Sequence, residues 1–212
     1  MKPAIIIGGG GHAKVLASTL QALDHPILGF TDPDESRASM LGVPRLGSDE
    51  IISSHDPSTV VLVNGVGCIE PGPLRAKIFR RFKDRGYSFL TVIHPAASVA
   101  KDAVIGEGTA VFAGAVVQTA VTIGENAILN TRASVDHDCE IGSHVHIAPG
   151  VTLSGAVSVG DGAHLGVGCT VIQGVAIGAE ALVGAGSVVL REVKAGSRVF
   201  GNPARTIPGS PA

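Results

Sequence analysis

Branched aliphatic side chains recur at every sixth position through the second half of the sequence, and this period restricts the possible folds more than any other feature. The series consists of Val99, Ile105, Val111, Val117, Ile123, Leu129, Val135, Ile141, Ile147, Leu153, Val159, Leu165, Val171, Ile177, Val183 and Val189. Four positions after each member comes a small or β-branched residue, as at Ala115 and Val121. Glycine recurs every 18 positions from Gly106 to Gly178, which adds a period of three units.

A unit of six residues has room for one short strand and one corner, and three units make a triangular coil whose backbone pairs with the coils above and below. An α-helix requires apolar residues at a spacing near 3.6, and a hairpin sheet requires strict alternation, so neither explains a period of six. The sequence therefore predicts a parallel β-helix of about five coils, stacked about 4.8 Å apart.

The composition fits a narrow aliphatic interior, because only 3% of the 212 residues are aromatic and tryptophan is absent. A formal net charge of −2 provides no basic surface for nucleic acid or an anionic membrane, so neither partner is expected. The apolar run Ala4–Ile7 near the N-terminus is too short for a signal peptide or a membrane span.

The three cysteines show no pairing pattern, and Cys139 and Cys169 occupy the small position of their hexads, whereas Cys68 precedes the repeats. An odd count of this kind indicates reduced thiols in a cytoplasmic protein, with the two hexad cysteines packed in the core.

The first hundred residues follow a different pattern, that of a nucleotide-binding α/β unit. The run Ala4–Ile7 predicts a strand that enters the glycine turn Gly8–Gly11, a helix follows, and a second strand ends at Asp32. Glycines let the backbone approach a phosphate closely, and the N-terminus of the following helix offers it free N–H groups. Asp32 is a candidate acceptor of a hydrogen bond from a ribose or sugar hydroxyl.

Gly8, Gly10 and Ala13 also satisfy the G-x-G-x-x-A dinucleotide fingerprint, so an NAD site is an alternative. Fewer than a hundred residues precede the hexads, which is enough for one mononucleotide-binding half but not for two. A nucleotide-linked small molecule therefore fits better. A third strand leads to Gly65, where a strand-end turn and a sugar contact both remain open.

A helix from about Pro73 to Arg85 carries Arg75 and five further basic residues, which are predicted to lie on a solvated face. His94 and Pro95 then mark the junction, because proline restricts the preceding residue to an extended conformation. We predict two domains: a Rossmann-like nucleotide-sugar-binding domain over residues 1–94 and a β-helix with a C-terminal tail over residues 95–212.

Four segments together resemble the sugar O-/N-acyltransferase family over almost the whole chain. They are Gly8–Val15 (GGGGHAKV), the His94-Pro95 entry to the hexads, Asn130–Cys139 (NTRASVDHDC) and Gly201–Ala204 (GNPA). That family includes sialic acid O-acetyltransferases and the N-acetyltransferases that act on UDP- or GDP-linked 4-amino-6-deoxy sugars in polysaccharide biosynthesis.

The resemblance implies a left-handed β-helix, a homotrimer with active sites between neighbouring subunits, and acetyl-CoA as acetyl donor, with no metal. The implied reaction moves an acetyl group to an amino group of a nucleotide-linked amino-deoxy sugar. O-acetylation of sialic acid or a related sugar is the alternative within the family.

Acetyl transfer requires a base with a pKa near neutrality, and His137 is the candidate. It corresponds to the family's catalytic histidine, and Asp138 corresponds to an acidic position that orients it. Asp136 competes for the orienting role. The period of 18 places Gly155 one coil above His137, about 5 Å away, where its N–H is free for an oxyanion. The family assigns its oxyanion contact to this position as well.

Further site residues follow from the same resemblance. It implies that acetyl-CoA contacts His146, Val167 and Ala185. It implies that the acceptor is held by Gly10, Gly11, His12, Asp32 and Gly65. The stretch Gly67–Pro73 departs from the shorter connection of the bacillosamine enzymes.

His146 is nine residues from His137, half a coil, so the two histidines could meet only across a subunit boundary. His146 and His164 are one coil apart and are expected to stack, and His144 is expected to be solvated.

Two readings from other classes remain. Hexapeptide β-helices also serve as zinc carbonic anhydrases, for which His137, His144 and His146 are candidate ligands. A non-catalytic trimer that binds nucleotide sugars is the other.

Overall fold

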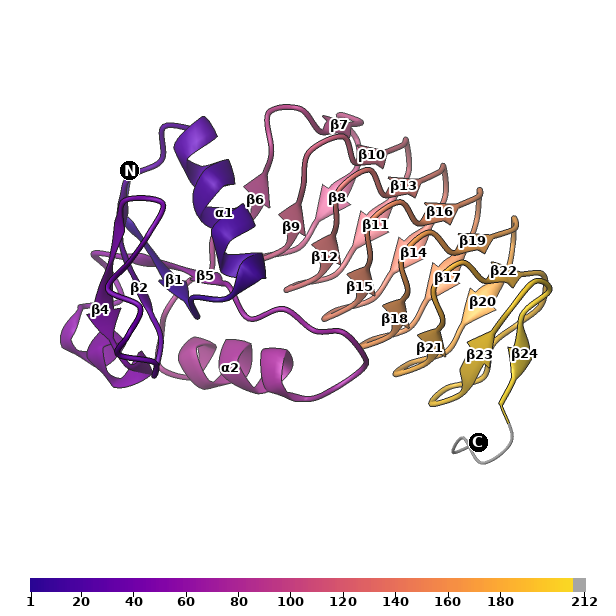
Figure 1. Cartoon of the computed structure of the whole chain (residues 1–212). Helices are drawn as coiled ribbons and strands as arrows, with labels where there is room; N and C mark the ends of the chain where they lie inside the picture. Colours follow the sequence, from indigo (N-terminus) through magenta and orange to yellow (C-terminus); the bar gives the residue numbers. More distant parts are fainter. Residues whose placement is uncertain (208–212) are drawn as a thin grey trace.

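The computed structural model describes residues 1–207, which form a small α/β unit followed by a long β-helix (Figure 1). The elements of the α/β unit are β1 (Ala4–Ile7), α1 (Gly11–Ala22), β2 (Ile27–Thr31), β3 (Ser39–Met40), β4 (Val43–Gly47), the 3-10 helix η1 (Asp49–Ser54), β5 (Val61–Asn64) and α2 (Leu74–Lys83). Strands lie in the order β3-β4-β2-β1-β5, and all adjacent pairs except β3 and β4 are parallel.

The central strand β1 is buried on both faces of this sheet. Ile6 packs with Leu16 and Leu20 of α1, whereas Ile5 and Ile7 pack with Phe79 and other residues on the side of α2. A strand covered on both faces needs a continuous apolar run, which is why this segment lacks alternation.

The β-helix winds left-handed through short strands of mostly two residues. They are β6 (Val92–Ile93), β7 (Ser98–Val99), β8 (Val104–Ile105), β9 (Ala110–Val111), β10 (Val116–Val117), β11 (Thr122–Ile123), β12 (Ile128–Leu129), β13 (Ser134–Val135), β14 (Glu140–Ile141), β15 (His146–Ile147), β16 (Thr152–Leu153), β17 (Ser158–Val159), β18 (His164–Leu165), β19 (Thr170–Val171), β20 (Ala176–Ile177), β21 (Leu182–Val183), β22 (Val188–Val189), β23 (Arg198–Phe200) and β24 (Arg205–Thr206). The predicted fold class is confirmed, but the β-helix has more than the five coils that the sequence predicts, because six strands form its first face alone.

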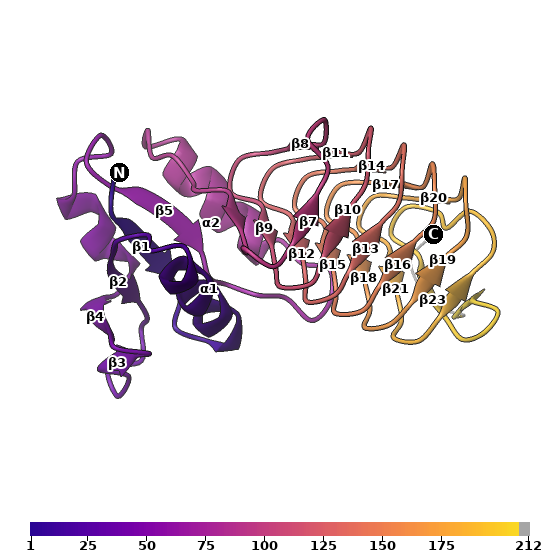
Figure 2. The same cartoon turned by 90° about the horizontal axis from the view of Figure 1, so that it is seen from above.

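Three parallel sheets form the faces of the prism, and Figure 2 shows how the strands of each sheet follow one another along its length. Face 1 has the order β22-β19-β16-β13-β10-β7, face 2 the order β20-β17-β14-β11-β8, and face 3 the order β24-β23-β21-β18-β15-β12-β9-β6, in which only β24 is antiparallel. Val117, Val135 and Leu153 pair in one column, so the register advances by 18 residues per coil. From Val111 onward, every aliphatic member of the hexads is buried inside the prism.

The glycine column explains the period of 18. A Cβ on Gly106 would lie 2.5 Å from the carbonyl carbon of Gly124, and one on Gly124 would lie 2.6 Å from the backbone nitrogen of Ser143. Stacked coils leave no room for a side chain at this corner, so each coil repeats the glycine.

The α/β unit packs against the first coils of the β-helix. Strand β6 already belongs to face 3, where Val92 pairs with Ala110. Phe112 and Ile128 of the β-helix share a cluster with Leu16 of α1. This contact brings the glycine turn and the loop before α2 alongside face 3.

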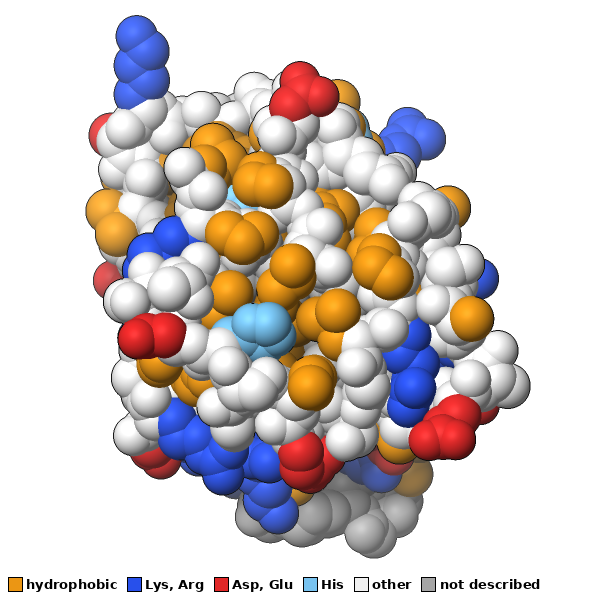
Figure 3. Space-filling view, turned by 90° about the vertical axis from the view of Figure 1, so that its left-hand side faces the viewer, with side chains coloured by type: hydrophobic (Ala, Val, Ile, Leu, Met, Phe, Trp, Pro, Cys, Tyr) orange, Lys and Arg blue, Asp and Glu red, His pale blue; other side chains and the backbone are white. Residues whose placement is uncertain are grey.

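On the end of the molecule formed by the α/β unit, acidic and basic side chains are interspersed around an apolar centre (Figure 3). No helix among residues 1–207 combines the length and apolar character needed to cross a bilayer.

Candidate active site

The corner between β13 and β14 holds His137 with its imidazole exposed. Nδ1 of His137 lies 2.7 Å from Oδ2 of Asp138, and the backbone N–H of His137 donates to Oδ1 of Asp136 at 2.8 Å. Asp138 has φ of +60°, a left-handed conformation that Asp tolerates better than most residues. The chain turns sharply here, and the turn brings the Asp138 carboxylate to the imidazole.

The hydrogen bond to Asp138 raises the pKa of His137 above its ordinary value, and the negative charges of Asp136 and Asp138 add to this. Nε2 of His137 has no hydrogen-bond partner within residues 1–207. The structure therefore presents a base whose pKa is raised and whose side chain is exposed, with its second nitrogen unpaired among the described residues.

Gly155 lies directly against the ring of His137, one coil further along. A Cβ on Gly155 would lie 2.6 Å from Cε1 and 2.7 Å from Nε2 of His137. The N–H of Gly155 has no acceptor among the described residues. A free backbone donor beside a base is the arrangement that stabilises an oxyanion.

His146, Val167 and Ala185 line one groove of about 400 Å³ on face 3 and its corner with face 1. Apolar side chains such as Leu182 and Phe200 complete it. The N–H groups of Val167 and Ala185 have no acceptor within residues 1–207. The groove thus offers apolar walls with free backbone donors along one edge.

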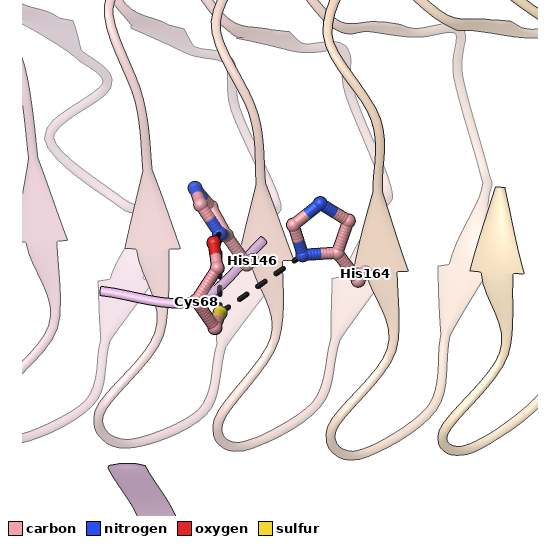
Figure 4. Close-up of side chains that lie close together, drawn as sticks. All are labelled: Cys68, His146 and His164. Atoms are coloured by element: carbon pink, nitrogen blue, oxygen red, sulfur yellow. Dashed lines mark hydrogen bonds between the residues drawn. The ribbon is translucent and has the colours of Figure 1, made fainter. Parts of the chain in front are cut away.

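His146 also belongs to a cluster with Cys68 and His164 (Figure 4). The two histidines pair across β15 and β18, as expected from their spacing, and their rings meet edge to face with centroids 4.7 Å apart. Burial, with a smaller effect of His164 and then of Arg75, lowers the pKa of His146 to about 3. Cys68 comes from the Gly67–Pro73 loop, and no pattern in the sequence indicates its position.

Beside the groove, a cavity of about 610 Å³ lies between the start of α1, the Gly67–Pro73 loop and the β-helix. Gly11, His12 and His146 line it, so the predicted acceptor and donor residues adjoin at His146. Nε2 of His12 is buried and has no hydrogen-bond partner among the described residues. Burial, followed by the charge of Arg75, lowers the pKa of His12 well below its usual value.

A second cavity, of about 330 Å³, opens on the other side of the glycine turn, where Gly10 and Gly11 meet Lys14 and Arg37. Nη1 of Arg37 donates to the Gly9 carbonyl at 2.5 Å and lies 3.6 Å from Oδ2 of Asp32. Asp32 does not line this cavity itself, but it pairs with Arg37, which does.

Gly65 is buried beneath α1, where a Cβ would lie 2.7 Å from the Ile7 carbonyl oxygen. It lines neither cavity beside the glycine turn.

Two expectations about solvated side chains are wrong. Arg75 is fully buried and donates to the backbone carbonyls of Asn64, Val66 and Asn126, and burial lowers its pKa to about 10. His144 is half-buried, with Nδ1 2.9 Å from Nδ2 of Asn126. Both residues lie at the junction between the α/β unit and the β-helix. The carbonyl groups at the end of β5 and at a β-helix corner need donors there, which Arg75 supplies. His144 instead pairs with the side-chain amide of Asn126.

His137 does not reach the groove within one chain. It lies at the corner of faces 1 and 2, whereas the groove lies on face 3. His137, His144 and His146, the candidate anhydrase ligands, likewise form no cluster. Among residues 1–207, the one group of three metal-ligating side chains is Cys68, His146 and His164.

Three family models match the chain. The PglD N-terminal domain matches residues 4–82, the bacterial transferase hexapeptide (six repeats) matches residues 120–155, and the hexapeptide repeat of succinyl-transferase matches residues 156–191. A curated relative, UDP-N-acetylbacillosamine N-acetyltransferase of Bacillus subtilis (strain 168), is 37% identical over 119 residues. That match covers 53% of this chain and 52% of the relative, so the chain aligns with about half of the curated relative's length.

Solved structures match over nearly the full length. The acetyltransferase domain of PglB from Neisseria gonorrhoeae FA1090 is 34% identical, with a TM-score of 0.92 and coverage of 98% of this chain and 100% of that one. PerB from Caulobacter crescentus, in complex with CoA and GDP-perosamine, is 40% identical, with a TM-score of 0.90 and 98% coverage of both chains. The chain belongs to the sugar acyltransferase family. The resemblance drawn from the sequence motifs is confirmed, and this sugar acyltransferase shares the two-part architecture of PerB and of the acetyltransferase domain of PglB.

Proposed function

We propose that this sugar acyltransferase transfers the acetyl group of acetyl-CoA to an amino group of a nucleotide-linked amino-deoxy sugar. The observation that carries the proposal is the exposed His137 corner, with Asp138 2.7 Å from Nδ1 and Gly155 against the ring. The relatives support an amino sugar as acceptor, because one is a UDP-N-acetylbacillosamine N-acetyltransferase and another, PerB, has been solved in complex with GDP-perosamine.

In this proposal His137 is the general base. Its Nε2 takes the proton that the acceptor amine loses as the new N–C bond forms, and the hydrogen bond from Nδ1–H to Asp138 stabilises the imidazolium. The C–S bond of the thioester then breaks, and the imidazolium gives the proton to the departing sulfur, so that CoA leaves as the free thiol. The N–H of Gly155 donates to the oxygen on which negative charge develops. Asp136 accepts a hydrogen bond from the backbone N–H of His137, so it stabilises the turn and does not bind the imidazole ring.

The groove on face 3 suits the donor. Acetyl-CoA supplies the reactive thioester, and its pantetheine arm is a narrow chain with amide groups. The apolar walls of the groove fit such a chain, and the free N–H groups of Val167 and Ala185 suit its carbonyl oxygens. His146 borders the end of the groove next to the larger cavity.

The α/β unit would bind the nucleotide part of the acceptor, and we propose the boundaries 1–94 and 95–212 for the two domains. Residues 208–212 of the second domain lie outside the described residues. Gly10 caps α1 and Gly11 is its first residue, so both lie at the helix N-terminus, where phosphate groups bind. No atom lies within 4 Å of the position that a Cβ would occupy on either glycine, so a phosphate can approach the backbone. Arg37 beside Asp32 adds a positive charge at the same turn.

A homotrimer would complete the site. His137 and the groove occupy different corners of one prism, so the base and the donor can meet only when the His137 corner of one subunit faces the groove of the next. Three flat-sided prisms around one axis provide three such pairs.

The decisive experiment is a panel of UDP- and GDP-linked amino sugars assayed with acetyl-CoA by release of free thiol, with product mass determined. We expect acetylation of an amino sugar and much slower release with the matching hydroxy sugar. Thiol release only with sialic acid would support O-acetylation instead, and acceptor binding without release would support a non-catalytic trimer.

A further inference from the structure

The Gly67–Pro73 loop crosses from the α/β unit to face 3 and brings Cys68 over two adjacent coils of the β-helix. Sγ of Cys68 lies 3.2 Å from Nδ1 of His146 and 3.9 Å from Nδ1 of His164 (Figure 4). Further along the loop, Glu70 accepts a hydrogen bond from Arg198 of β23 at 2.7 Å. The loop is thus attached to face 3 at two points.

These distances match the edges of a zinc coordination tetrahedron. A Zn–S bond of about 2.3 Å and a Zn–N bond of about 2.1 Å at the tetrahedral angle place sulfur and nitrogen about 3.6 Å apart. The two S···N distances, 3.2 and 3.9 Å, lie on either side of that value. One ligand atom from each of the three residues lies within 4.8 Å of the other two.

We propose that Cys68, His146 and His164 form a zinc-binding site with a fourth coordination position open to the groove. Thiolate and imidazole ligands favour zinc over magnesium or calcium, which prefer oxygen. Cys68 and His146 both line the groove and the larger cavity, so a water molecule has access to the open position. The site is separate from the His137 corner.

Metal binding requires two changes in the cluster. Cys68 must release its thiol proton to solvent. Nδ1 of His146 now lies 3.0 Å from the Cys68 carbonyl oxygen and Nε2 lies 3.2 Å from Nδ2 of Asn130, a pattern that assigns the proton to Nδ1. The proton must therefore move to Nε2, and the Asn130 amide must turn so that its oxygen accepts it.

Two charges face the cluster from other elements. Beside the larger effect of burial, the positive charge of Arg75 on α2 acts to lower the pKa of both Cys68 and His146 and disfavours a bound cation. The negative charge of Glu70 acts to raise the pKa of His164 and favours a cation. The thiolate of Cys68 supplies the remaining negative charge.

Zinc here would occupy the end of the groove that we propose for pantetheine. This consequence depends on the proposed function, whereas the metal site itself does not. Zinc and CoA are then expected to compete for the protein.

The test titrates the full chain, purified with a reductant and without chelator, with Zn²⁺ by calorimetry and with Co²⁺ by absorbance. We expect one Zn²⁺ per chain with Kd of about 1 µM or tighter, and a thiolate-to-cobalt charge-transfer band. Cys68→Ser and His164→Gln should each weaken binding at least about 100-fold, because loss of even a hydrogen-bond partner of a metal ligand typically costs about 10- to 100-fold.

Cys169→Ala is the matched control, since it removes a thiol from a hexad position that alanine fills in other coils, and it should bind Zn²⁺ as the parent does. Circular dichroism checks that each variant is folded. Zinc binding that is absent, or unchanged in folded Cys68→Ser, would overturn the site. Zinc binding with undiminished CoA affinity would instead contradict the proposed position of pantetheine.

Discussion

At the residue scale, the function depends on His137, whose Nδ1 is held by a carboxylate and whose Nε2 is free. We expect His137→Ala to lower kcat by at least about 10²-fold, since general-base catalysis contributes about 10²- to 10⁴-fold. Steady-state thiol release with saturating acceptor measures this. Near-parental turnover in a folded variant would remove His137 from the mechanism.

Asp138→Asn is expected to move the acidic limb of the kcat/KM profile to lower pH. Asp138 raises the pKa of His137, and the base works only when deprotonated, so activity rises with pH through that pKa. Removing the negative charge lowers the pKa of His137. Because the imidazole is then a weaker base, the plateau of kcat/KM should also fall, by about 10-fold. Asp136→Asn is the control, because Asn keeps the acceptor for the His137 N–H, and it should shift the limb less. A limb that stays in place for Asp138→Asn would contradict this assignment.

Gly155→Ala tests the space above the imidazole. The backbone of Gly155 does not need positive φ, so the fold should be retained, but the new methyl group would lie within 2.7 Å of His137 Nε2. The ring must move, and misplacement of a catalytic group by about 1 Å can cost about 10²-fold in rate. We expect kcat to fall to that extent while Tm stays constant. Unchanged kcat would show that the ring position is not critical.

At the element scale, Gly65 packs against α1 whereas Gly11 begins this helix, and the two glycines have different environments. Gly65→Ala would press a methyl group against the Ile7 carbonyl and Cβ of Ala13, so we expect the free energy of unfolding to fall by about 1–3 kcal/mol. Denaturant unfolding measures it. Gly11→Ala is the matched control, because a methyl group there meets no atom within 4 Å, and stability should be retained. Equal stability of both variants would contradict the tight packing between β5 and α1.

At the scale of the whole molecule, a site shared by two subunits can be tested by complementation. His137→Ala removes the base, and Ala185→Trp fills the groove. Mixed trimers contain sites in which an intact His137 faces an intact groove, so a one-to-one co-expressed mixture should recover about a quarter of parental activity. If base and groove act within one chain, the mixture will be no more active than its components.

Much of this arrangement was predictable from the sequence. The inward aliphatic residues, the glycine column, and the pairing of His146 with His164 follow from periods of six and 18, because each residue contacts its counterpart in the next coil. The proximity of Gly155 to His137 follows in the same way. The family motifs then identified the sugar acyltransferase.

Contacts between the α/β unit and the β-helix were not predictable. The basic residues of α2 suggest a solvated face, yet Arg75 enters the junction, where unpaired carbonyls require a donor. His144 lies at the same junction, where its Nδ1 pairs with the side-chain amide of Asn126. The position of Cys68 depends on the path of a loop of irregular sequence.

The sequence alone determined the fold class and the family, because a repeating coil encodes its contacts at fixed, short separations that recur many times. Only the tertiary structure decided what lies at the junction: Cys68 reaches His146 across 78 residues, and Arg75 reaches Asn126 across 51. Such contacts occur once and depend on how two separately patterned units pack. No period in the chain specifies them.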